Sequence, residues 1–208
     1  MHFARTTIAA LLMSLAVSAA SAATLSATQV GNVSTEGVPQ FSNLTVNWID
    51  GWKNVGFIQF DLSGYSAGVS NAVLNLYHQH NSVLGATFAL YVNTSPWSSP
   101  VNTWNDRPSY TTASSSMLTI EDTSQGLWRS VDVTAAANAW ATGAMPNYGF
   151  TLERTDQVNP NAYFVASGEF APTLNVTAVP EPEAYAMLLA GLGVMGAVAR
   201  RRKQKALA

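Results

Sequence analysis

Runs of strand length in which apolar residues alternate with polar ones recur through the middle of this chain, and turn residues separate them. The segment 55–62 (VGFIQFDL) is β-branched and aromatic and stops at Ser63-Gly64, while the segment 70–80 (SNAVLNLYHQH) alternates residue by residue. Five further segments have the same character: Ala86–Asn93, Leu127–Val133, Tyr148–Arg154, Ala162–Gly168 and Pro172–Val179. A period of two residues places one face of a strand against a core. Short strands repeated in this way predict an all-β fold, a single jelly-roll β-sandwich.

One segment breaks the period of two. Residues 132–143 (DVTAAANAWATG) place Asp132 or Thr134 as a helix cap before a run of alanines, and Gly143 follows where a C-terminal glycine belongs. We expect one short helix that covers an end of the sandwich. Its inward side is predicted to consist of Val133, Ala136, Ala137 and Trp140.

The N-terminus has the three-part layout of a secretory signal peptide. Arg5 supplies a short positive region, residues 6–20 are apolar, and Ala20-Ser21-Ala22 or Ser21-Ala22-Ala23 fits the small-residue cleavage site. We therefore predict a signal peptide over residues 1–23 and an exported protein. The chain has no cysteine, so the fold rests on its core or on bound ions.

Residues 24–179 are long enough for one domain with a substantial core. This segment has four basic and ten acidic residues, a net charge of −6, whereas the whole chain has a formal net charge of −2. A surface of negative sign repels phosphate backbones. We therefore expect no nucleic-acid partner.

The C-terminal segment, residues 180–208, joins an apolar stretch to a basic cluster. The stretch 184–199 has no charged residue and would extend about 24 Å as a helix, slightly less than the roughly 30 Å of a bilayer core. Flanking residues could close that gap, and Arg200, Arg201 and Arg202 would stay on the cytoplasmic side. The pattern predicts a transmembrane helix that leaves the domain outside the cell.

Pro180-Glu181-Pro182, the apolar helix and the cluster Arg200, Arg201 and Arg202 together resemble the PEP-CTERM sorting signal. In that family the tail is processed by the membrane peptidase exosortase. The resemblance implies an exosortase-type peptidase as a partner, anchoring in the inner membrane before processing, and delivery to the outer surface or extracellular matrix. An ordinary permanent anchor is the alternative.

A second resemblance covers most of residues 55–179. The elements FDLS (60–63), NAVLNLY (71–77), TWNDRP (103–108), DVT with Trp140, GFTL (149–152) and PTLNV (172–176) occur in the order typical of DNRLRE domains, a family named after disaggregatase-related proteins. The resemblance implies a jelly roll similar to carbohydrate-binding modules. Its relatives include polysaccharide-binding domains.

Aromatic side chains bind sugars by stacking a ring face on the apolar face of a pyranose. Trp97, Trp104, Tyr110 and Trp128 lie in or near predicted loops or short strands, and we take them as the candidate ligand-binding residues. A structural role is the competing interpretation, above all for Trp104, because the TWNDRP turn could hold a long loop in place. Trp140 is predicted to lie in the core, and Trp48 and Trp52 fit either role.

The metal content stays open at this stage. His78 and His80 would point to one face of a strand and could bind a metal with a third ligand, although a solvated polar face explains them as well. A structural calcium ion is a further alternative, with ligands among the dispersed residues Asp50, Asp61, Asp106, Asp122 and Asp132. We expect no other cofactor.

No residue is assigned a catalytic role. The chain lacks a G-x-S-x-G nucleophile motif, although paired carboxylates cannot be recognised from sequence. We predict a non-catalytic, polysaccharide-associated surface module. The alternatives are a purely structural biofilm protein without a defined sugar ligand and a small polysaccharide lyase or hydrolase.

Overall fold

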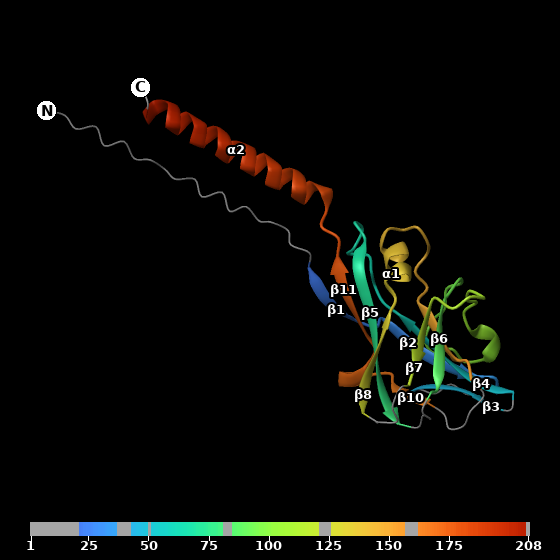
Figure 1. The fold of residues 1–208 in the computed structure, drawn as a ribbon. Helices are drawn as coiled ribbons and strands as arrows, with labels where there is room; N and C mark the ends of the chain where they lie inside the picture. The colour runs from blue at the N-terminus through green and yellow to red at the C-terminus, as the bar shows by residue number, and fades with distance from the viewer. Residues whose placement is uncertain are drawn as a thin grey trace. The chain divides into compact units, whose positions relative to one another are not determined.

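The computed structural model describes residues 21–36, 43–49, 51–80, 85–120, 126–156 and 162–206 (Figure 1). The predicted signal peptide therefore lies, up to residue 20, outside the described residues, as do the candidate calcium ligands Asp50 and Asp122. Ala20–Val179 forms one compact unit, and the segment from Pro180 onward belongs to another.

In the described part of the chain, antiparallel strands form two sheets that share the strand β3 (Figure 1). Sheet A consists of β1 (Ala22–Ser26), β11 (Thr173–Ala178), β5 (Val69–His80), β8 (Leu127–Asp132), β10 (Ala162–Val165) and the first part of β3 (Asn43–Ile49). Sheet B consists of the last part of β3, β4 (Trp52–Gln59), β2 (Gln29–Ser34), β9 (Phe150–Arg154), β6 (Thr87–Val92) and β7 (Ser116–Thr119).

The two sheets enclose an apolar core, as the alternating pattern predicts. On β5, the side chains of Leu74 and Leu76 are fully buried, whereas Asn75 and Tyr77 between and after them are only partly buried. Removing such alternating apolar side chains from water supplies the main driving force for pairing two sheets face to face. The predicted all-β fold is confirmed.

The strand β3 turns the corner between the sheets. Leu44 pairs with Phe164 of β10, while Trp48 pairs with Lys53 of β4. Gly56 on β4 makes this crossing tight, because a Cβ atom at that position would lie 2.5 Å from Cδ1 of Leu44. The absence of a side chain at Gly56 therefore lets the corner strand pack closely on sheet B.

The helix α1 (Thr134–Ala141) occupies the segment where we expect a helix, and it packs against β5. Ala136, Ala137 and Trp140 are buried, as predicted. The prediction of Asp132 or Thr134 as the cap is wrong, because Val133 is the N-cap residue. The Asp132 carboxylate accepts a hydrogen bond from the Thr134 backbone N–H at 2.8 Å, and Thr134 Oγ1 accepts one from the Ala72 N–H at 2.9 Å. Both residues thus fasten the start of the helix rather than cap it in the usual way.

The interpretation of His78 as part of a solvated polar face is wrong. Its side chain is fully buried, and its ring centroid lies 5.6 Å from that of Phe164. The alternation of β5 explains this position, because His78 follows Leu74 and Leu76 on the inward face. The side chain of His80 lies outside the described residues.

In the C-terminal segment, the helix α2 (Pro182–Ala206) begins at the second proline of the Pro-Glu-Pro triplet. Proline is favoured at a first helical position because its missing N–H would have no partner there. Among the residues that the structure describes, no helix is both long and apolar enough to span a membrane, so the predicted transmembrane helix is not borne out. Glu183 and the basic residues from Arg200 onward belong to α2, and they make its apolar stretch shorter than the helix itself.

Candidate functional site

Three aromatic rings gather on the outer face of sheet A, and we call Tyr77, Trp128 and Phe170 the aromatic platform. Tyr77 and Trp128 are direct partners on β5 and β8, and their ring centroids lie 5.3 Å apart. Phe170 ends the short 3-10 helix η2 (Gly168–Phe170) and stacks on Tyr77 at 4.2 Å. The rings of Trp128 and Phe170 are 42% and 38% exposed. Large apolar side chains that stay exposed together mark a binding surface more often than isolated ones do.

A row of small polar side chains lies next to the aromatic platform, and we call Ser130, Asn75 and Thr173 the polar strip. These residues face one another across β8, β5 and β11. Ser130 Oγ donates a hydrogen bond to Asn75 Oδ1 at 2.7 Å, and Asn75 Nδ2 donates one to Thr173 Oγ1 at 3.4 Å. The chain of bonds orients each group while leaving oxygen lone pairs of Ser130 and the hydroxyl proton of Thr173 available.

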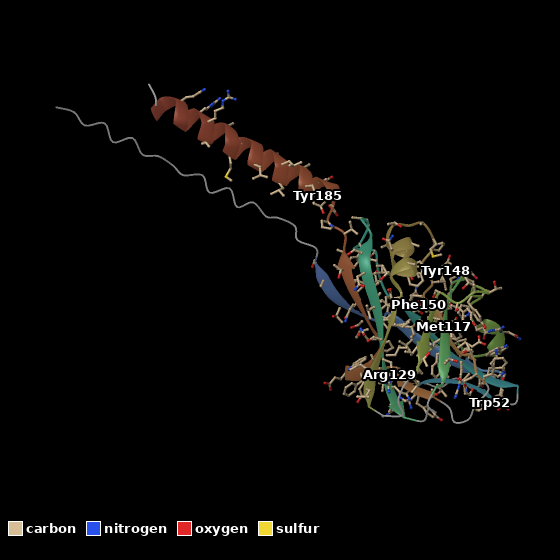
Figure 2. All side chains as sticks on the ribbon, viewed as in Figure 1. Trp52, Met117, Arg129, Tyr148, Phe150 and Tyr185 are labelled. Atoms are coloured by element: carbon tan, nitrogen blue, oxygen red, sulfur yellow. The ribbon has the colours of Figure 1, made fainter. Side chains whose placement is uncertain are left out.

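The outer face of sheet B is different, because a long loop between β6 and β7 covers part of it. Trp97 and Trp104 of this loop pack against a second apolar cluster formed by Val33, Val55, Phe57 and Val101. The Trp97 ring lies 5.5 Å from that of Phe57, and its Nε1 donates to the Tyr148 carbonyl at 2.8 Å (Tyr148 is labelled in Figure 2). Trp97 therefore anchors the loop on the sheet.

Trp104 begins the 3-10 helix η1 (Trp104–Asp106), which the TWNDRP segment forms. The Asp106 carboxylate accepts hydrogen bonds from the backbone N–H and the hydroxyl of Thr103, at 3.1 and 2.8 Å. The Arg107 guanidinium lies 4.3 Å from the centre of the Trp104 ring and donates to the Trp104 carbonyl at 2.7 Å. A sugar that stacked on this ring would have to compete with Arg107 for its face.

Tyr110, in the second half of the loop, belongs to a polar network centred on Glu153. Its hydroxyl donates to Glu153 Oε2 at 2.9 Å, while Lys53 forms an ion pair with Oε1 of the same carboxylate. Burial and the nearby Glu153 charge raise the pKa of Tyr110 to about 12. The pKa of Tyr91 is raised as well, mainly by burial and to a lesser extent by the charge of Glu153. The Tyr91 ring lies 5.2 Å from that of Tyr110. The Lys53 ammonium lies 4.0 Å from the centre of the Trp48 ring. This network holds the end of the loop to β4 and β9.

The geometry thus divides the four candidate residues between two faces. Trp97, Trp104 and Tyr110 lie together on sheet B, where each has partners within the loop or the sheet. Trp128 lies on the outer face of sheet A with two rings that are not among the candidate ligand-binding residues from the sequence, Tyr77 and Phe170. As a set, the four residues do not form one site.

The protein-family comparison bears on both faces, since the model of carbohydrate-binding module family 96 matches residues 20–178. The chain belongs to this family. A PEP-CTERM protein-sorting motif matches residues 178–203. No curated protein gives a significant match to the chain.

The family 96 module spans all the described strands of both sheets, from β1 to β11. Modules of this kind bind carbohydrate and are not themselves catalytic. The sorting motif indicates export and targeting to the cell surface, and it includes Pro180, Glu181 and Pro182 as well as Arg200, Arg201 and Arg202. The prediction of an exported, polysaccharide-associated surface module is therefore confirmed at this level.

Within the described residues of the family 96 module, no group of three or more His, Cys, Asp or Glu side chains could hold a metal ion. Two of the candidate calcium ligands have other partners. Hydrogen bonds from Ser63 lower the pKa of Asp61, and hydrogen bonds from Thr134 lower that of Asp132. A structural calcium ion stays an untested prediction, because Asp50 and Asp122 lie outside the described part of the chain.

Proposed function

We propose that this family 96 module binds an extracellular polysaccharide through the aromatic platform and polar strip of sheet A. The observation that carries this proposal is the three-ring platform, in which Trp128 and Phe170 are exposed and Tyr77 is half-buried, beside a row of hydroxyl and amide groups. A ring face can stack on the apolar face of a pyranose, and the adjacent polar groups can exchange hydrogen bonds with sugar hydroxyls. Trp128 is the central binding residue in this proposal.

The packing of the platform favours tight binding. Tyr77 contacts both other rings, so Trp128 and Phe170 have fewer orientations to lose when a ligand arrives. Each side chain that must be immobilised on binding costs about 0.5–1.5 kcal/mol, and a ring already held by its neighbours avoids part of this cost. The sheet below the rings adds further rigidity.

The proposal includes the path to the surface. A signal peptide over residues 1–23 directs export, residues 24–179 form the binding module, and residues 180–208 form the sorting tail. Removal of the signal peptide leaves Thr24–Ser26, which pair with Thr173–Asn175 of β11. An exosortase-type peptidase then cuts near Pro180-Glu181-Pro182, after a transient stay at the inner membrane with Arg200, Arg201 and Arg202 on the cytoplasmic side. The mature protein is delivered to the outer surface or the extracellular matrix.

We also propose a relationship to the DNRLRE domains. The positions of the shared elements support it, since two of them contain similar turns. Asp61 of the FDLS element accepts a hydrogen bond from the Ser63 N–H at 2.9 Å, and Asp132 of the DVT element accepts one from the Thr134 N–H at 2.8 Å.

Non-catalytic binding completes the proposal, in agreement with the family. Glu153, the most buried of the described carboxylates on sheet B, already has Lys53 and Tyr110 as partners. A general acid or base needs a proton that it can exchange with a substrate. The engagement of both Glu153 oxygens argues against such a role.

The proposal is tested with the Trp128→Ala variant in a binding assay against a polysaccharide array. We expect at least a tenfold loss of affinity, about 1.4 kcal/mol, because the largest ring of the platform is removed. Leu127→Ala is the matched control. Leu127 is the adjacent residue of β8, is 41% exposed and lies on the opposite face of the strand. Equal binding by the wild type and Trp128→Ala, or no polysaccharide binding by the wild type, would contradict the proposal.

A further inference from the structure

The charge of the binding face indicates which class of polysaccharide it takes. We propose that the ligand of sheet A is an uncharged polysaccharide, one unit of which stacks on the aromatic platform while the next lies over the polar strip. This inference rests on the proposed function and adds the ligand class to it. It follows from three features of the face: its lack of cations, its two carboxylates and the chemistry of its polar groups.

Backbone alternation identifies the side chains that point outward from sheet A. Leu74, Leu174 and Val131 lie in the core, so the outward positions are the odd-numbered residues of β5 from Asn71 onward, those of β11, and the even-numbered residues of β8. Leu25 packs against the same core, so even-numbered residues of β1 point outward. At these described positions there is no Lys or Arg. Alternation places Arg129, the basic residue of β8, on the other face of that strand.

The charged groups near the platform are both acidic. Asp132 is the next outward residue of β8 after Ser130, and its carboxylate accepts a hydrogen bond from the Thr134 backbone N–H. Glu169 directly precedes Phe170 and is exposed. Two unit charges of like sign 4 Å apart repel by about 1 kcal/mol in water. An acidic polysaccharide would therefore meet repulsion at each end of the face without a cation to offset it.

The polar strip suits neutral sugar hydroxyls, because Ser130 and Asn75 keep oxygen lone pairs that can accept and Thr173 keeps a hydroxyl proton that it can donate. Ser130 and Thr173 present hydroxyls, and Asn75 presents an amide between them. A carboxylated sugar instead needs dedicated donors, which arginine or lysine usually provides. Further along the same face, Thr24 Oγ1 donates to Asn175 Oδ1 at 2.9 Å, so neutral hydroxyl and amide groups continue onto β11 and β1.

The spacing of the two features fits adjacent sugar units. Ser130 follows Trp128 by two residues on the same face of β8, and Asn75 precedes Tyr77 by two on β5. Two residues of an antiparallel strand span about 7 Å, and neighbouring strands lie about 4.8 Å apart. One sugar ring on Trp128 would thus place the next unit within reach of Ser130 and Asn75.

The test measures binding of the full chain to neutral hydroxyethylcellulose and galactomannan and to acidic polygalacturonate. The protein is kept in a polyoxyethylene detergent, because α2 exposes apolar side chains such as Tyr185 and Met187, and a sugar-based detergent would compete for the site. Each measurement is made at 50 and 500 mM NaCl. We expect binding to a neutral polymer that changes less than twofold with salt and falls at least tenfold in Trp128→Ala.

Asp132→Asn separates the two ligand classes. The amide oxygen of asparagine can still accept the Thr134 N–H bond, so the variant changes charge and keeps the turn. With a neutral ligand we expect an affinity within twofold of the wild type. Asn75→Ala should weaken binding at least fivefold, whereas Asn71→Ala, about 14 Å further along β5, is the control and should not.

Three other results would contradict the proposed ligand class, the proposed site, or both. Binding to polygalacturonate that is lost in Trp128→Ala and strengthened in Asp132→Asn would overturn the neutral ligand class and leave the proposed site intact. Binding to any polymer that Trp128→Ala does not affect would overturn both the site and the ligand class. Absence of binding to all three polymers by the wild type would likewise overturn both.

Discussion

Two tryptophans of this chain illustrate how much the partners of a single residue decide. The Trp128 ring makes an edge-to-face contact with Tyr77, lies next to the Phe170 ring, and remains 42% exposed. Trp97 has its N–H bonded to a carbonyl and its ring against Phe57. The same residue type thus serves as a ligand platform in our proposal at one position and as a loop anchor at the other.

The Tyr110–Glu153 pair leads to a prediction about pH. The folded state keeps the Tyr110 proton up to about pH 12, whereas an unfolded tyrosine loses it near pH 10. The stability that this residue contributes is therefore fully present below pH 10 and is lost as the pH rises toward 12. We expect the free energy of unfolding of the wild type, measured with urea, to fall over this interval relative to that of Tyr110→Phe. A constant difference between the two proteins from pH 9 to 12 would contradict this expectation.

At the scale of elements, the loop between β6 and β7 and the face of sheet A have separate tasks. The loop packs Trp97 and Trp104 on an apolar cluster and bonds Tyr110 to Glu153, so contacts within the protein hold it in place. On the outer face of sheet A, in contrast, the side chains of Trp128 and Phe170 remain partly exposed to solvent. Stability and binding should therefore be separable by mutation.

Trp97→Phe tests this separation. The substitution keeps an aromatic ring near Phe57 but removes the Nε1 donor to the Tyr148 carbonyl. We expect a loss of about 1–2 kcal/mol in the free energy of unfolding, since one partly buried hydrogen bond and some packing disappear. Polysaccharide affinity should stay within twofold. The comparison is Trp128→Phe, whose unfolding should change by less than about 0.5 kcal/mol, as is usual for exposed positions. A loss of binding in Trp97→Phe without a loss of stability would move the ligand site to sheet B.

At the scale of the whole molecule, the two ends of the module lie on neighbouring strands. Ala22 of β1 pairs with Thr177 of β11, and the Val179 N–H donates to the Gly68 carbonyl at 3.0 Å. The fold is therefore complete one residue before Pro180. In our proposal, processing near the Pro-Glu-Pro triplet removes the tail without opening a strand.

A chain that ends at Val179 tests this. Every residue of the two described apolar clusters lies between Ala23 and Val176, so we expect its melting temperature to stay within about 2 °C of that of the full chain, measured by circular dichroism. A chain that ends at Ala171 is the contrast. It lacks β11, with the core residues Leu174 and Val176, and should not unfold cooperatively. A large drop for the chain ending at Val179 would show that the tail stabilises the module.

The sequence by itself determined the local features. The period of two in residues 70–80 places Leu74 and Leu76 in the core, the alanine run forms α1, and the Pro-Glu-Pro triplet with its basic cluster belongs to the sorting motif. These features depend on neighbours a few residues apart, and such neighbours are readable in a linear chain.

Only the tertiary structure decided which aromatic residues meet. Tyr77 and Trp128 become partners through the register of β5 with β8, Phe170 reaches them from η2, and Trp97, Trp104 and Tyr110 gather on the other sheet. Strand register depends on packing between segments that are about fifty to one hundred residues apart in this chain, and a shift of one residue would exchange the two faces. The sequence reveals that the four candidate residues are aromatic, while their division between partly buried loop anchors and an exposed platform follows from how the two sheets pack.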